Sequence, residues 1–97
     1  KVLLDAVERV VRGMPALGEV VVVAADDDEW GQVPVVVATG SDSIADVRDL
    51  VARELGRAAA PARIVTVADL PRLSNGKPDR VGAARLARVD GSASSET

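Results

Sequence analysis

The chain has 97 residues, a formal net charge of −3 at pH 7, no cysteine and no histidine. This is the size of one small domain, and its core must be aliphatic because Trp30 is the only aromatic residue. The missing residue types exclude disulfides, thiolate chemistry and histidine-based catalysis, and the negative charge argues against a nucleic-acid surface. No apolar run approaches the roughly 20 residues of a membrane span, and no signal peptide is visible, so we expect a cytoplasmic protein.

A helix is expected at the N-terminus, in a chain that begins with Lys1 and is therefore expected to be a piece of a longer protein. Four apolar residues form one helical stripe, at spacings of four, three and four: Leu3, Val7, Val10 and Met14. Glu8 is expected on another face of this helix, and Gly13 and Pro15 are expected to end it.

Two valine-rich runs predict a pair of strands over residues 19–25 and 33–39. The first contains four consecutive valines without alternation, which predicts a strand buried on both faces in the centre of a sheet. Pro34 is expected at the start of a strand or on an edge, because it cannot donate a ladder hydrogen bond. The two strands are expected to form a hairpin.

The acidic residues 26–29 lie between these strands. They are interpreted as a solvated turn rather than as a metal site, and we assign no metal ligand in the chain. Trp30 is expected to be a packing anchor where this turn folds back on the sheet.

A second helix is expected to begin at Ser43, an N-cap followed three residues later by the Asp46 carboxylate, and to end at Gly56. Its charged residues are interpreted as a salt-bridged solvent face rather than as an anion site; they are Arg48, Asp49, Arg53, Glu54 and Arg57.

Residues 63–68 predict a third strand, and Asp79 is expected to cap a last helix on which Gly82, Leu86 and Val89 share one face. The Ser- and Gly-rich residues from 91 onward are typical of a flexible tail. The order of elements predicts an α+β fold, a small three-stranded mixed sheet flanked by helices on both faces.

The loop over residues 70–80 carries Lys77, one of two lysines in the chain, directly after Gly76. It is not a Walker A loop, because Pro71 and Pro78 stand where that motif needs glycine and Ser or Thr. Asn75-Gly76 favours a turn. An ordinary exposed turn with a solvated lysine therefore remains one interpretation.

The string Leu-Pro-x-x-x-x-Gly-Lys-x-x-Arg, between a strand and a last helix, resembles the closing motif of the adenylate-forming enzymes. These are the acyl-CoA synthetases, the adenylation domains of peptide synthetases and the luciferases. Seven positions agree: Leu70, Pro71, Ser74, Gly76, Lys77, Asp79 and Arg80. Upstream, residues 7–8, 17–23 and 28–32 are similar to the family's Glu-Val-Glu helix start, the strand after it and its Asp-x-x-Trp-Gly-Gln turn.

The resemblance implies that residues 1–89 are the small C-terminal lid domain of an acyl-CoA ligase, with residues 90–97 as a flexible tail. The large N-terminal AMP-binding domain is absent from the sequence. Leu4, Ala6 and residues 58–61 depart from the family pattern. The last of these departures puts the transfer of CoA contacts to that region in doubt.

The resemblance also implies chemistry in two half-reactions. A carboxylic acid and Mg²⁺-ATP, bound mainly by the large domain, give an acyl-adenylate and pyrophosphate, and coenzyme A then displaces AMP. Lys77 is the implied catalytic residue of the first step, supported by its loop, which comprises Ser74, Asn75, Gly76, Asp79 and Arg80. Arg80 is expected to pair with Asp79 or with the large domain. The small domain is implied to rotate between the steps, and Arg53, Arg57 and Arg63 are candidate contacts for CoA phosphates.

The resemblance leaves three functions open. The first is an ATP-dependent acid–CoA ligase, with an o-succinylbenzoate–CoA ligase of menaquinone biosynthesis as one candidate. The second is the adenylation domain of a peptide synthetase, and the third is a non-catalytic interaction module with the same fold. The 97 residues alone are expected to be inactive.

Overall fold

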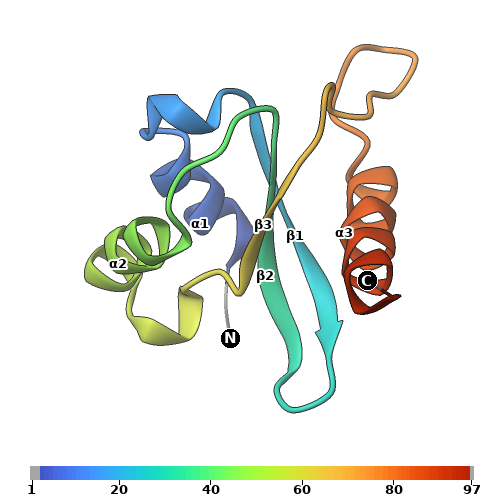
Figure 1. The fold of residues 1–97 in the computed structure, drawn as a ribbon. Helices are drawn as coiled ribbons and strands as arrows, with labels where there is room; N and C mark the ends of the chain where they lie inside the picture. Colours follow the sequence, from blue (N-terminus) through green and yellow to red (C-terminus); the bar gives the residue numbers. More distant parts are fainter. Residues whose placement is uncertain (1–2, 97) are drawn as a thin grey trace.

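A computed structural model describes residues 3–96, with side chains described up to residue 88 (Figure 1). The elements in chain order are α1 (Leu4–Val11), η1 (Pro15–Leu17), β1 (Val20–Asp27), β2 (Gly31–Ala38), α2 (Ile44–Leu55), η2 (Arg57–Ala59), β3 (Arg63–Thr66) and α3 (Arg80–Glu96). The sheet has the order β1-β2-β3. β1 and β2 are antiparallel, from Val20 opposite Ala38 to Asp27 opposite Gly31, and β3 runs parallel to β2. The predicted mixed sheet is confirmed.

Helices cover both faces of this sheet, with α1 and α2 on one face and α3 on the other (Figure 1). Alternate valines of the strands divide between two cores. Val20, Val22 and Val36 pack with α1 and α2, whereas Val21 and Val23 pack with α3. The prediction that β1 is buried on both faces is confirmed, but its predicted central position is wrong. β1 is an edge strand, and both its faces are buried because helices, not neighbouring strands, cover them.

The β1–β2 hairpin is tighter than expected, because β1 extends into the acidic run to Asp27 and β2 already begins at Gly31. The Asp27 carboxylate closes this turn by accepting hydrogen bonds from the backbone N–H groups of Glu29 and Trp30, both at 2.9 Å. The Trp30 side chain is 72 % exposed, so its predicted role as a packing anchor is wrong. The valines already fill both sheet faces, and the turn projects past them.

Pro34 lies within the central strand β2, opposite Ala24, and not at its start or in an edge strand. Its carbonyl accepts from the N–H of Ala62, just before β3 pairing begins at Val35 opposite Arg63. The backbone N and C=O of one strand residue point to the same side of the strand, which for Pro34 is the side of β3. The nitrogen of Pro34, which carries no hydrogen, therefore faces a position beyond the end of the β2–β3 ladder. The local environment of Pro34 is therefore that of an edge.

Both predicted caps of α2 are confirmed. The N–H of Asp46 donates to the Ser43 hydroxyl at 3.3 Å, and the N–H of Gly56 donates to the carbonyl of Ala52 at 2.8 Å. The predicted salt-bridged face of α2 is not found, because no described ion pair involves its residues. Arg48 instead donates to the backbone carbonyl of Pro61 at 2.7 Å.

α3 packs on the sheet through small residues, the fully buried Ala83 and Ala87, and not through the predicted face. Leu86 is 38 % exposed, and Val89 has a side chain outside the described set. Alanines have small side chains, which allows the helix to pack against the valines of the sheet. The backbone of α3 also continues through residue 96, over the segment expected to be a tail.

Gly40 marks a close approach between the end of β2 and η1. Its N–H donates to the carbonyl of Leu17 at 2.8 Å, and a Cβ at this position would lie 2.1 Å from the carbonyl oxygen of Ala16. Only glycine fits there. In residues 3–96, no helix is long and apolar enough to cross a membrane.

Candidate functional site

The loop between β3 and α3 is an ordered hairpin that projects from one end of the domain (Figure 1). The buried side chain of Leu70 anchors its first strand, and a bridge pairs Arg72 with Pro78. The N–H of Leu73 donates to the carbonyl of Lys77 at 2.8 Å, and the N–H of Asp79 donates to the carbonyl of Pro71 at 2.9 Å. The loop is therefore held by its own backbone.

The predicted Asn75-Gly76 turn is confirmed at the tip of this loop. The N–H of Gly76 donates to the carbonyl of Leu73 at 2.9 Å, and Gly76 has φ +87°, a conformation that favours glycine. The Asn75 side chain accepts from the N–H of Lys77 at 3.0 Å. Ser74 and Lys77 are exposed, so the turn presents the lysine amine to solvent on a fixed backbone.

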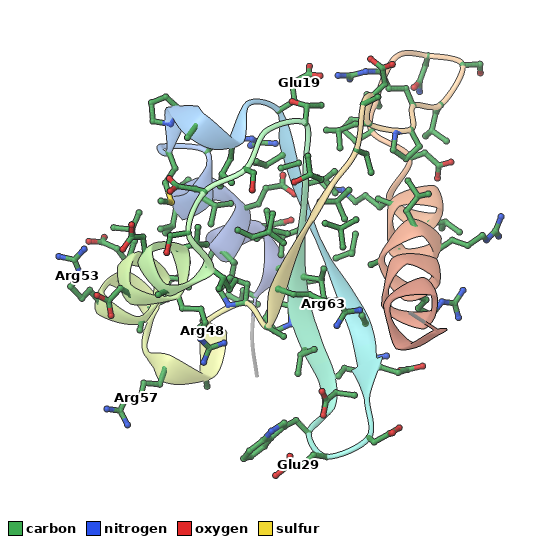
Figure 2. All side chains as sticks on the ribbon, in the orientation of Figure 1. Glu19, Glu29, Arg48, Arg53, Arg57 and Arg63 are labelled. Carbon is green, nitrogen blue, oxygen red and sulfur yellow. The ribbon has the colours of Figure 1, made fainter. Side chains whose placement is uncertain are left out.

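Arg72 ties the loop to the start of β1, a role that the sequence analysis missed. One guanidinium nitrogen donates to the carbonyl of Gly76 at 3.2 Å, and another pairs with the Glu19 carboxylate at 2.6 Å. Because Glu19 lies far from Arg72 in the sequence, no local pattern indicates this pair. Figure 2 shows Glu19 at the end of the domain from which the loop projects.

Asp79 caps α3, as predicted, by accepting from the N–H of Gly82 at 2.9 Å. The next residue, Arg80, does not pair with Asp79. Its guanidinium binds the Glu8 carboxylate of α1 with both terminal nitrogens, at 2.8 and 3.1 Å. Glu8 was expected on an outer face of α1, yet it is only 3 % exposed. The spacing of apolar residues along α1 does not indicate that Glu8 is buried, because the partners of Glu8 come from β1 and α3.

The surroundings of Glu8 determine its ionisation. Burial alone raises the pKa of its carboxyl, but hydrogen bonds from Arg80 and from the N–H of Val22, with the charges of Arg80 and Arg12, outweigh burial and lower the pKa below 4.5. The hydrogen bond to Glu8 likewise raises the pKa of Arg80. Glu8 is therefore a buried anion held by two guanidinium groups.

This lowered pKa predicts acid sensitivity. A carboxyl whose pKa is lower in the folded state contributes stability that is complete above its unfolded value, 4.5 here, and is lost as the pH falls through the folded value. The free energy of unfolding should therefore fall more steeply for the native protein than for Glu8→Gln as the pH falls below 4.5. Parallel pH profiles in chemical denaturation would contradict this assignment.

The three arginines expected to contact CoA are not brought together. Arg63, on β3, points to α3 and donates to the carbonyl of Ala87 at 3.0 Å. Arg53 lies on α2 and Arg57 on η2. Figure 2 shows Arg53 at the side of the domain and Arg57 toward the end away from Glu19. Arg57 lines a cavity of about 620 Å³, whose other lining residues include Trp30, Gln32, Pro34, Arg48 and Ala58.

The acidic run does not form a metal-binding cluster. Asp27 caps the hairpin turn, and the Asp26 carboxylate accepts from the Gln32 amide at 3.1 Å. Within the described residues, no group of three or more His, Cys, Asp or Glu side chains could hold a metal ion.

Known proteins with similar sequences share this domain as a small part of their length. The chain is 36 % identical over 85 residues to the medium/long-chain-fatty-acid–CoA ligase FadD8 of Mycobacterium tuberculosis. The alignment covers 76 % of this chain and 15 % of that protein. A 30 % identity over 71 residues relates it to the 2-succinylbenzoate–CoA ligase of Lactococcus lactis, covering 73 % and 16 %. The chain thus spans about one sixth of these relatives.

The same architecture occurs in the amide bond synthetase McbA from Marinactinospora thermotolerans, with a TM-score of 0.78 and 27 % identity over 87 % of this chain and 18 % of that one. Residues 6–77 match the AMP-binding enzyme C-terminal domain, a segment that runs from α1 to the exposed lysine of the loop. The chain belongs to the AMP-binding enzyme C-terminal domain family.

Proposed function

We propose that this chain is the mobile C-terminal domain of an ATP-dependent acid–CoA ligase and that Lys77 is its catalytic residue. The observation that carries the proposal is the loop: its backbone is fixed by hydrogen bonds and its tip exposes one lysine amine. In a domain of this family, such a loop can insert an ammonium group into an active site formed by a larger domain. Asn75, Gly76, Asp79 and Arg80 hold the backbone of the loop, and Ser74 lies exposed in the turn.

The proposed chemistry has two steps. In the first, a carboxylate oxygen attacks the α-phosphorus of ATP, a P–O bond forms, and pyrophosphate leaves. Both reactants are anionic, so an ammonium between them offsets their repulsion and fixes their approach. In the second, the thiol of CoA attacks the acyl carbon, its proton is released, and AMP leaves with the C–O bonding electrons.

We assign Mg²⁺-ATP mainly to the large domain, because the described residues of this chain offer no metal-binding group. The magnesium ion neutralises phosphate charge when it is bound. The role of this chain is limited to Lys77 and to the position of its loop.

We assign the nucleotide part of CoA to the cavity beside Arg57. Trp30 exposes an aromatic face on which a base can stack, and the cavity is also lined by Arg57, whose guanidinium suits phosphate groups. The hydrogen bond from Arg48 to Pro61 and that from Arg63 to Ala87 give those two arginines structural roles. Of the three expected CoA contacts, Arg57 is the one that the cavity supports.

The cavity and the Lys77 loop lie at opposite ends of the domain (Figures 1 and 2). One reaction centre cannot contact both ends at the same time. This separation supports a rotation of the domain between the adenylate-forming and thioester-forming steps.

Trp30→Ala is expected to raise the KM for CoA by about 5- to 150-fold, because stacking of one base on an aromatic side chain is worth about 1–3 kcal/mol. Arg57→Ala is expected to raise it by up to about fivefold, since an exposed ion pair is worth up to about 1 kcal/mol. Adenylate formation should be unchanged in both variants. Arg53→Ala, an exposed arginine on α2 that does not line the cavity, is the matched control. An unchanged KM for CoA in Trp30→Ala would place the nucleotide elsewhere.

Product analysis of the full protein tests the overall function. With ATP, CoA and a panel of carboxylic acids that includes 2-succinylbenzoate, an acid–CoA ligase releases AMP and pyrophosphate and forms a thioester. A peptide-synthetase adenylation domain would exchange pyrophosphate without acylating CoA, and an interaction module would do neither. Formation of ADP and phosphate would contradict the proposal.

A further inference from the structure

Glu8 is the one charged side chain that the structure buries among residues 3–88. Each of its carboxylate oxygens accepts two hydrogen bonds. Oε1 accepts from the N–H of Val22 at 2.9 Å and from Arg80 at 2.8 Å, and Oε2 accepts from Arg12 at 2.7 Å and from Arg80 at 3.1 Å. The carboxylate therefore joins α1, the outer edge of β1 and the first residue of α3.

Burying such an anion is a costly way to stabilise a fold. The desolvation penalty of a buried ion pair offsets much of its attraction, and apolar residues of similar volume often give equal stability. A guanidinium bound by two nitrogens has a defined plane and distance, which apolar contacts do not provide. The Glu8–Arg80 pair is therefore better explained by the position that it gives to Arg80 than by its contribution to stability.

Arg80 is three residues after Lys77, and the segment between them is stiff. The proline ring restricts the backbone of Pro78, which also bridges to Arg72, and Asp79 is bonded to Pro71 through its N–H and to Gly82 through its side chain. A displacement of Arg80 is thus transmitted to Lys77. The packing of α3 alone resists displacement weakly, because its buried contacts come from the small side chains of Ala83 and Ala87.

We propose that Glu8 is a positioning residue for the adenylate-forming step. Glu8 fixes the position of Arg80, and through Arg80 that of the base of the loop, so that Lys77 reaches the reacting groups. The proposal rests on the function proposed for Lys77. The Arg72–Glu19 pair holds the other strand of the loop, but both of its side chains are exposed, at 41 % and 61 %, so it is the weaker of the two attachments.

The test uses the full protein and measures the two half-reactions separately, as ATP–pyrophosphate exchange and as thioester formation from a supplied acyl-adenylate. Glu8→Gln places an amide against the Arg80 donors and removes the bidentate pair. We expect exchange to fall by about 10- to 100-fold, because a misplacement of about 1 Å can cost a factor of 10². Thioester formation should be largely retained. Arg12→Gln, which touches the same carboxylate but not the loop, should change neither half-reaction.

Arg80→Lys is a second variant, which keeps the positive charge but loses the planar guanidinium that binds both oxygens of Glu8. If Glu8 acts through Arg80, the double variant Glu8→Gln/Arg80→Lys should be no slower in exchange than the slower single variant. Multiplicative losses in the double variant would overturn the proposal. Equal losses of both half-reactions in Glu8→Gln would also overturn it, since they indicate a general structural role.

Hydrogen exchange of the loop amides provides a readout that does not depend on activity. The amides of Leu73, Gly76 and Asp79 should exchange faster in Glu8→Gln than in Arg12→Gln, and equal rates would overturn the proposal. Lys77→Ala is measured in parallel. If it leaves pyrophosphate exchange intact, the function proposed for Lys77 fails, and the loop amides alone then decide whether Glu8 holds the loop.

Discussion

Lys77→Ala in the full protein is expected to lower adenylate formation by about 10²–10³-fold, the usual effect of removing one group that stabilises charge in a transition state. The reason is geometric as well as electrostatic. Lys77 is exposed at the tip of a loop whose backbone is fixed, and the other cations of the loop, Arg72 and Arg80, are paired with Glu19 and Glu8. Thioester formation from a supplied acyl-adenylate should be largely retained, because the loop is proposed to be withdrawn in that step.

Two further variants test this prediction. Lys77→Arg retains a positive charge but replaces a compact ammonium with a planar fork, so it should recover only part of the activity. Arg85→Ala removes an exposed cation from α3 and controls for the change in net charge. Pyrophosphate exchange and single-turnover thioester formation measure the two steps. An equal loss in both would exclude a role confined to adenylate formation.

Gly40→Ala is expected to have the largest effect on folding. The added methyl group would lie 2.1 Å from the carbonyl oxygen of Ala16 and 2.9 Å from the carbonyl carbon of Leu17. These are backbone atoms, and they cannot move away without breaking the hydrogen bonds that Gly40 and Ser41 donate to Leu17 and Ala16. We expect a loss of about 3 kcal/mol, at the upper end for overpacking, and a fall in Tm of roughly 12–24 °C.

Gly13→Ala is the matched control for this prediction. A Cβ there would lie 3.3 Å from a single carbonyl oxygen, that of Val10 at the end of α1. Its effect on Tm should therefore be small. Calorimetry of the full protein, read at the unfolding transition of this domain, would detect the difference between the two variants, and a Tm shift of similar size in both would show that the contact between η1 and β2 can relax.

Much of the fold could be predicted from short stretches of sequence, because the physical causes are local. The four valines of β1 favour an extended backbone, Ser43 and Gly56 bound α2, and Asn75-Gly76 forms a turn. Each of these features depends on residues within a few positions of one another. The tip of the candidate site was therefore predictable.

The attachments of the site were not predictable in this way. Glu8 and Arg80 meet across 72 positions, and Arg72 and Glu19 across 53. A glutamate within an amphipathic helical pattern is normally assigned to the solvent-facing side. For Glu8 that assignment is wrong because its partners from β1 and α3 bury it. The packing role predicted for Trp30 is wrong for a related reason, because the valines of the hairpin already fill both layers of the core.

The uniform valine content of the hairpin has a consequence for how its strands align. A slip of one residue between β1 and β2 would exchange the two faces, yet within the runs 20–23 and 35–37 it would mostly replace valine by valine. Apolar burial therefore discriminates poorly between the native alignment and its neighbours. The discrimination comes from a few polar atoms: the Glu8 carboxylate on the N–H of Val22, the Glu19 and Thr39 contacts at one end, and the Asp27 turn at the other. A small number of polar contacts therefore helps to fix the alignment of the two strands.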